Sequence, residues 1–211
     1  MPKIFVILIF LSILLNSCIT FPVVSHTEGA STLPGRNAKL SLGEYAREIF
    51  LSSRLGIYKG NFLGIDSGIS FYYSLPSSDF FCYSVYPDLK ISFFQNDKSK
   101  FGTGLGISFL SLYYTPISQI NSQQNLYYVL PMYMESEITE WFSFILNFRF
   151  FVPIICSEVV DQTPYNKSFI TMNAGVSFFN LVTIQGYMLA SPSSENIFPV
   201  PGIQLTYQVN F

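Results

Sequence analysis

The chain has 211 residues, which leaves room for a single domain once a leader is removed. Charged residues make up only 11% of the chain, against roughly 25% in soluble domains, whereas aromatic residues reach 18%. This composition predicts a large surface that faces something other than water. The formal net charge of −2 excludes a basic face for nucleic acid, so no nucleic-acid partner is expected. No run of about 20 apolar residues follows the leader, which excludes membrane-spanning helices.

Residues 1–17 have the pattern of a secretory signal peptide: a lysine, the apolar run 4–15, then small and polar residues. The run ends in the sequence LNSC at residues 15–18, with Leu three positions before the cysteine. This sequence resembles a bacterial lipobox of the relaxed, spirochaete-like kind, although Asn in the middle departs from the commonest pattern. The resemblance implies that Cys18 becomes a lipidated N-terminus. The alternative is a plain signal cleaved nearby, with Cys18 incidental.

Residues 18–36 are expected to form a lipid-anchored tether. The stretch after the cysteine is rich in Ser, Thr, Pro and Gly and has no hydrophobic period. It contains His26, the only histidine of the chain. The predicted division is therefore a signal peptide at 1–17, a tether at 18–36 and a β-barrel at 37–211.

Apolar and polar residues alternate from residue 37 onward, which predicts β-strands. The pattern is clearest in 202–211 and in 141–151. In the second of these ranges, Phe or Leu stands at every second position. A strand with an apolar face opposite an uncharged polar face is typical of the wall of an outer-membrane barrel. The fold predicted is all-β, an up-and-down antiparallel transmembrane barrel of about ten strands, with eight as the alternative. The predicted strands are 37–43, 49–58, 62–73, 82–94, 101–114, 126–136, 141–152, 168–179, 182–189 and 202–211.

Short and long connections alternate between the predicted strands. The longer ones are richer in Pro, Ser, Asn and Gln, above all 116–125 and 153–167. Outer-membrane barrels have short periplasmic turns and long external loops, and an even strand number leaves both termini in the periplasm. The two longest connections are therefore the expected contact loops for an external ligand.

The polar face of the strands is small and uncharged, as in the alternating glycines of 102–106. Such residues suit the crowded interior of a narrow barrel and would make a poor water-facing surface. This favours a membrane barrel over a soluble lipocalin-like barrel, whose apolar face points inward and whose usual Gly-x-Trp signature is absent. Pro87 and Pro131 fall within predicted strands, so bulges or local irregularity are expected there.

Several short motifs are shared with a widespread class of bacterial proteins. They are Arg54-Leu-Gly-Ile57, Leu63-Gly-Ile65, Asp88-Leu-Lys90 and Thr139-Glu-Trp141. With them, the chain from residue 54 onward resembles uncharacterised outer-membrane barrel proteins. The resemblance implies a bacterial outer-membrane location among outer-membrane lipids, and no activity. Terminal Phe211 on an alternating strand resembles the signal read by the barrel-assembly machinery.

No catalytic, cofactor or metal site is predicted, and the chain is expected not to be an enzyme. Phospholipase-type barrels need a Ser/His arrangement and omptin-type proteases an Asp/His pair, whereas His26 falls in the predicted tether. A single histidine without a Cys-x-x-Cys motif does not make a usual metal site. Cys82 and Cys156 are expected near the external rim as two thiols. A disulfide between them is the alternative, which requires a Cα separation below about 7 Å across the barrel.

Seven charged residues fall on the polar face and are expected to point into the lumen. They are Lys39, Arg54, Asp66, Asp88, Lys90, Glu135 and Arg149. Because an isolated buried charge costs several kcal/mol, an ion-pair network that fills a narrow barrel is expected. The alternative is a selectivity lining.

The expected function is a structural or surface-interaction (adhesin-like) role through the external loops. The alternatives are a narrow transport conduit, or small porin, and a soluble lipid-anchored periplasmic carrier of the lipocalin type.

Overall fold

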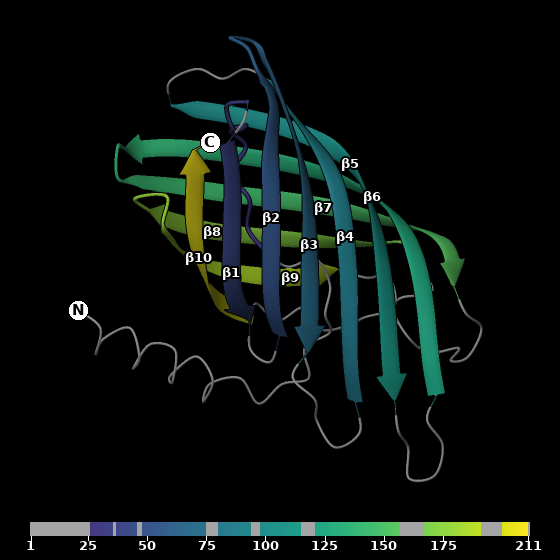
Figure 1. Cartoon of the computed structure of the whole chain (residues 1–211). Helices are drawn as coiled ribbons and strands as arrows, with labels where there is room; N and C mark the ends of the chain where they lie inside the picture. Colours follow the sequence, from purple (N-terminus) through teal and green to yellow (C-terminus); the bar gives the residue numbers. More distant parts are fainter. Residues whose placement is uncertain are drawn as a thin grey trace, which may run out of the picture.

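The computed structural model describes residues 26–35, 37–45, 48–74, 80–93, 98–114, 121–156, 167–190 and 200–210. In these ranges the chain forms ten antiparallel strands, each paired with the next, and β1 pairs with β10 to close a barrel (Figure 1). The predicted all-β, up-and-down, ten-stranded fold is confirmed, and no helix of the described part could span a membrane. The strands are β1 (Asn37–Tyr45), β2 (Glu48–Lys59), β3 (Leu63–Ser74), β4 (Phe80–Phe93), β5 (Ser99–Tyr114), β6 (Asn121–Thr139), β7 (Phe142–Cys156), β8 (Phe169–Phe178), β9 (Val182–Ala190) and β10 (Val200–Asn210).

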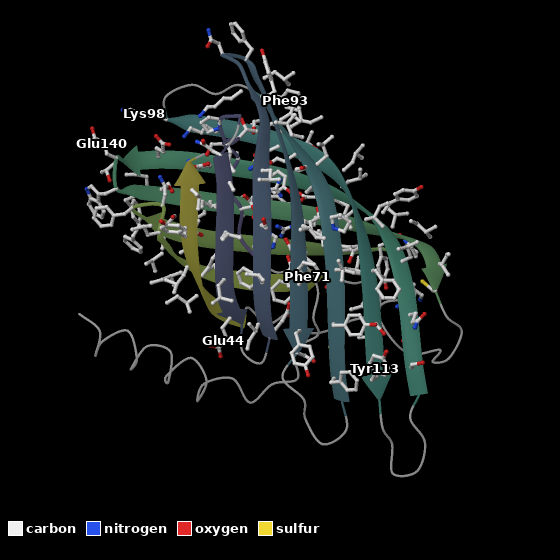
Figure 2. All side chains as sticks on the ribbon, in the orientation of Figure 1. Glu44, Phe71, Phe93, Lys98, Tyr113 and Glu140 are labelled. Atoms are coloured by element: carbon white, nitrogen blue, oxygen red, sulfur yellow. The ribbon has the colours of Figure 1, made fainter. Side chains whose placement is uncertain are left out.

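The barrel has two different ends. The turn end carries the connections 60–62, 140–141 and 179–181, and the loop end is the opposite end, where β1, β3, β5, β7 and β9 end. Figure 2 shows labelled Lys98 and Glu140 at the turn end, and Glu44 and Tyr113 at the loop end. The strand ends that flank the two candidate contact loops lie at the loop end.

Two strands at the loop end are longer than their sequence pattern indicates. Residues 121–125 belong to β6 and residues 153–156 to β7, because they continue the ladders with their neighbours, as in the pair of Asn125 with Cys156. The rest of the two candidate contact loops, apart from residue 167, lies outside the described residues.

Pro87 and Pro131 interrupt their ladders without shifting them. The β4–β5 pairing skips Tyr86 and Pro87, the β5–β6 pairing skips Leu130 and Pro131, and the register is the same on both sides of each gap. The expected irregularity is therefore present, but as missing pairs and not as bulges. The register shifts lie elsewhere, between Gly56 and Tyr58, Leu126 and Tyr127, and Glu137 and Thr139.

Strand β7 shows how the two faces are used. Ser143, Asn147 and Arg149 are buried inside the barrel, whereas Phe144 and Phe150 are 41% and 37% exposed on the outside. The same alternation places polar residues inward along most of the wall.

The loop-end half of the lumen contains an aromatic cluster of inward-facing side chains. Phe151 stacks on Phe169 at 4.4 Å between ring centroids, and Tyr127 meets both rings edge-on. The small residues of the polar face did not predict this cluster. Phe151, however, lies two positions after Arg149 and therefore on the same face of β7. Its members are Phe50, Tyr72, Cys82, Tyr86, Leu110, Leu112, Tyr127, Val129, Phe151, Phe169 and Tyr187.

Residues 26–35, the plug segment, run through the lumen from the aromatic cluster to the turn end. Figure 1 shows this segment as a purple coil between β1 and β2 in front and the strands behind. Buried residues of the segment include His26, Glu28 and Leu33, which are 1%, 3% and 8% exposed. The sequence predicts a tether over 18–36, but residues 26–35 of that stretch lie inside the barrel. Their polar backbone is satisfied there by side chains of the wall.

Candidate functional site

The plug segment is held at its start by amide and guanidinium groups of the wall. Asn147 accepts a hydrogen bond from the Glu28 N–H and donates one to the Glu28 carbonyl, both at 2.7 Å. Gln185 Oε1 accepts from the Thr27 N–H at 2.7 Å, and Arg149 donates to the His26 carbonyl at 2.8 Å. These side chains take the place of a neighbouring strand, because a buried backbone needs partners for its N–H and C=O groups.

Further along, three predicted lumen charges bind the plug segment. Lys90 Nζ donates to the carbonyls of Gly29 at 3.0 Å and Ser31 at 2.8 Å. Glu135 accepts from the backbone and hydroxyl of Ser31, at 3.1 and 2.8 Å. Asp66 accepts from the Leu33 N–H at 3.3 Å. Lys90 and Asp66 therefore bind the backbone of the plug segment as well as an opposite charge, and Glu135 binds Ser31 of the segment.

The Glu28 carboxylate lies among three cations of the wall. Its Oε1 is 3.2 Å from Arg54 Nε, 3.4 Å from Lys39 Nζ and 3.6 Å from Lys90 Nζ. Glu28 is in the plug segment and not in a strand, and it is 3% exposed. Burial alone would raise its pKa, but Arg54, Lys39 and Lys90 lower that pKa well below its ordinary value. Glu28 is therefore ionised at neutral pH.

Arg54 joins the plug segment to two acids of neighbouring strands. Its NH1 is 2.5 Å from Asp66, and its NH2 is 2.7 Å from both oxygens of Asp88. Tyr133 donates a further hydrogen bond to Asp88 at 3.0 Å. A side chain at Gly68 would place its Cβ 2.8 Å from the Asp88 carboxylate, so this position accommodates the ion pair.

The plug segment adds an acid to the predicted network. That network contains four cations, Lys39, Arg54, Lys90 and Arg149, and three acids, Asp66, Asp88 and Glu135. Glu28 supplies a further acid, which lies against Lys39, Arg54 and Lys90. Because an unpaired buried charge costs several kcal/mol, these ion pairs stabilise the segment in its place.

His26 lies at the inner end of the plug segment and is 1% exposed. Its Nε2–H donates to Glu28 at 3.2 Å, the Tyr72 hydroxyl donates to Nδ1, and its ring lies 5.5 Å from that of Phe50. Burial lowers the pKa of His26 to about 4, so its ring is neutral at pH 7. The sequence argument against Ser/His or Asp/His chemistry assumed a histidine outside the barrel, and that assumption is wrong. Both ring nitrogens nevertheless contact side chains, which gives His26 a structural position.

The remaining candidate residues are placed as follows. Lys39 keeps a 21% exposed side chain at the turn end. Cys82 is buried, and its backbone N–H donates a hydrogen bond to the Ser74 hydroxyl. Neither Cys82 nor Cys156 forms a disulfide among the described residues. Cys18 and Phe211 lie outside the described residues. Within the described ranges, no group of three or more His, Cys, Asp or Glu side chains could hold a metal ion.

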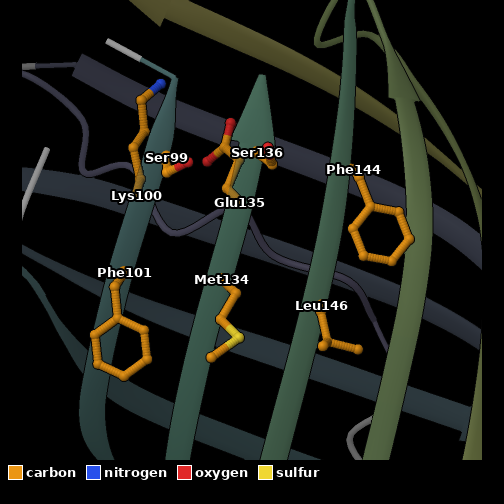
Figure 3. A pocket seen from close by; sticks show the side chains of 8 residues that line it. All are labelled: Ser99, Lys100, Phe101, Met134, Glu135, Ser136, Phe144 and Leu146. Carbon is orange, nitrogen blue, oxygen red and sulfur yellow. The ribbon is translucent and has the colours of Figure 1, made fainter. Parts of the chain in front are cut away.

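Two hollows lie near the turn end. A cavity of about 260 Å³ lies between plug segment and wall, and its charged lining includes Glu28, Lys39 and Lys90. A groove of about 420 Å³ lies across β5, β6 and β7, where Phe101 and Met134 lie below the hydroxyls of Ser99 and Ser136 (Figure 3). Only the first of these hollows touches the charged network around Glu28.

No family model matches the chain, and no curated protein sequence matches it. Among solved structures it is similar to the NanC porin, at 7% identity and a TM-score of 0.43, over 82% of this chain and 99% of that one. LpxR from Salmonella typhimurium is 8% identical with a TM-score of 0.41, over 83% and 100% of the two chains. The KdgM porin, solved in complex with disordered oligogalacturonate, is 9% identical with a TM-score of 0.35, over 83% and 99%.

Proposed function

We propose that this protein is a bacterial outer-membrane β-barrel with a closed lumen. It acts as a structural or surface-interaction protein through its loop end, and a lipid on Cys18 adds a second attachment to the membrane. The observation that carries the proposal is the presence in the lumen of two sets of buried residues, the aromatic cluster in one half and the plug segment in the other.

The outer face of the wall supports the membrane location. Exposed side chains of the strands are largely apolar, whereas the lumen holds the charged network, which is the reverse of a soluble carrier. The strands have 9 to 19 residues, enough for the roughly 9–11 that a tilted strand needs to cross a bilayer. Examples of the exposed apolar residues are Ile49, Leu51, Leu55, Phe71, Leu105, Leu130, Phe144, Phe150 and Leu205.

Aromatic side chains near the turn end agree with this placement. Tyr58, Phe62, Trp141 and Phe179 are all about half exposed or more, from 49% to 84%. Trp141 and Phe179 lie 6.1 Å apart between ring centroids, on neighbouring turns. Such aromatic belts mark the interface of a membrane barrel with water.

Planar-bilayer recording of the refolded full-length chain tests the closed lumen. We expect no stable conductance steps, because the aromatic cluster and the plug segment both lie in the lumen. A known small porin recorded in the same bilayers is the positive control. Stable open steps of the full-length chain at low voltage would contradict the closed state.

A gated conduit is the second candidate function. Polar side chains provide the hydrogen bonds that hold the plug segment, and a cavity already separates part of it from the wall. A variant lacking residues 26–35 tests it, with the folded state checked by heat modifiability on a gel. Steps that appear only in this variant would favour a conduit. If the barrel is a closed scaffold, neither protein should show conductance steps, since the aromatic cluster remains in both.

A further inference from the structure

We propose that Lys39, Arg54 and Lys90 form a binding site for a small organic carboxylate, which the side chain of Glu28 occupies in the closed barrel. The inference goes beyond the proposed function, because it needs neither a membrane orientation nor a role for the loop end. It rests on the geometry of the described residues around Glu28.

The three cations come from three different strands and converge on one oxygen. Lys39 of β1 is the register partner of Arg54 of β2, and Lys90 reaches the same carboxylate from β4. Glu28 comes from a segment without regular structure. The wall therefore provides a fixed receptor, and the plug segment provides the carboxylate as an internal ligand.

Without Glu28, the site would carry a surplus of positive charge. In the ion pairs that the described residues form, Lys39, Arg54 and Lys90 would be left with Asp66 and Asp88. Arg54 binds both of these acids, and Lys90 lies 3.3 Å from Asp66. One cation would then lack a countercharge. Charge-assisted hydrogen bonds from ammonium and guanidinium groups favour a carboxylate at this position over a neutral solute of the same shape.

A solute can reach the site from the turn end. The cavity of about 260 Å³ touches Glu28, Lys39 and Lys90 directly. Gln204 also lines the cavity; it is 2% exposed, and its Oε1 accepts no hydrogen bond while its amide donates to Thr206 at 3.1 Å. Gln204 offers an acceptor for a donor group on the ligand.

Chemical rescue tests the proposal on the full-length chain. Glu28→Ala removes the internal carboxylate and leaves its space. We expect a lower urea midpoint than in the unmodified protein, and a rise toward the original midpoint when acetate is added at constant ionic strength. Acetamide, of the same shape without charge, is the probe for unspecific filling and should leave the midpoint where it was. A ligand that binds only the folded state stabilises it by mass action.

Three further proteins sharpen the result. Glu28→Gln keeps the side-chain volume, so acetate should not raise its midpoint, and the unmodified chain should not respond either. Adding Lys39→Gln to Glu28→Ala should weaken the rescue by acetate. Glu140→Ala, which removes an exposed acid in the turn between β6 and β7, should respond to neither probe.

The same comparison can be made if Glu28→Ala folds poorly. Its folded yield, read by heat modifiability, should then rise with acetate and not with acetamide. Equal effects of the two probes on midpoint or yield, or a Glu28→Ala protein as stable as the original, would overturn the proposal. Neither result bears on bilayer conductance, so failure here and failure of the closed-lumen function can be told apart.

Discussion

The side-chain amide of Asn147 exchanges two hydrogen bonds with the backbone of Glu28, one to its N–H and one to its carbonyl, each at 2.7 Å. This contact fixes the height of the plug segment in the lumen. It thereby places the Glu28 carboxylate among Lys39, Arg54 and Lys90. The position of the internal carboxylate therefore depends on a neutral residue of β7.

Asn147→Leu should loosen the plug segment. The change removes both hydrogen bonds and leaves two buried backbone groups without them, so we expect a loss of about 2–4 kcal/mol in the free energy of unfolding. Urea midpoints of protein refolded into lipid vesicles measure this loss. Gln208→Ala, at an exposed position of β10, is the control and should stay near the original value. Equal midpoints for all three proteins would show that Asn147 does not hold the segment.

Gly56→Ala should displace the plug segment by steric contact. A Cβ at this position would lie 2.1 Å from the Pro34 carbonyl oxygen and 2.8 Å from that of Leu33, both backbone atoms. Relief requires movement of the segment or of β2, for which we expect a cost of about 1–3 kcal/mol. Gly186→Ala is the matched control, because its Cβ would meet nothing within 4 Å. A wild-type urea midpoint for Gly56→Ala would mean that residues 33 and 34 lie elsewhere.

The two faces of β7 should respond unequally to substitution. Phe148→Arg puts a charge on the outer face, which costs roughly 2–4 kcal/mol near the bilayer midplane and should block insertion into vesicles. Arg149→Gln removes a buried donor to the His26 carbonyl and should cost about 1–3 kcal/mol with insertion retained. Insertion yield and urea midpoints measure both. The opposite order of effects would mean that the exterior faces water.

Mild acid should weaken the plugged state. The folded-state pKa of His26, about 4, lies below its ordinary value of 6.5, because burial disfavours the charged ring. Between these values the unfolded chain binds a proton that the folded chain does not, so this stability is present above pH 6.5 and is lost as the pH falls toward 4. The groups that face the ring are Glu28, Tyr72, Arg54 and Arg149.

The expected loss from pH 7 to pH 4.5 is about 1–3 kcal/mol in the free energy of unfolding. His26→Gln carries no titrating group and should show a smaller loss over this interval, with urea midpoints as the readout. The lowered pKa of Glu28 acts in the same direction only below its ordinary value of 4.5. An identical pH dependence of the two proteins would count against a buried neutral His26.

Lipidation and assembly remain predictions about the two chain ends. Cys18→Ala should abolish labelling by a clickable fatty acid and leave the barrel able to fold, and undiminished label would refute the lipid on Cys18.

Deletion of Phe211 should lower the folded yield in the outer membrane. The deletion would remove a terminal aromatic, worth about 1.5–3 kcal/mol if fully buried, and the proposed assembly signal. Unchanged yield would argue against that signal.

The strands could be predicted from the sequence because period-two alternation is imposed by a wall with two different faces. Arg149 and Phe150 differ by one position and point to opposite sides, which alternation alone specifies. Strand ends were less predictable, since the polar residues 121–125 look like a loop and pair as strand.

The plug segment could not be predicted in this way. Its bonds run from side chains of the wall to its backbone, so its own residues need no hydrophobic period. The inward-facing charges Lys39, Arg54 and Lys90 do not indicate that an acid from outside the strands joins them. Glu28 lies against these cations only in the folded chain.

Thiol labelling of the plug segment tests the central claim most directly. In a chain whose three native cysteines are replaced by serine, Ala30→Cys and Pro34→Cys are treated in the folded state with a maleimide that does not cross membranes. Ala30 is 0% exposed and Pro34 is exposed at the turn end. We therefore expect rapid labelling of Pro34→Cys, and labelling of Ala30→Cys only after unfolding in urea. Equal, rapid labelling of both cysteines in the folded barrel would contradict a lumen closed by residues 26–35.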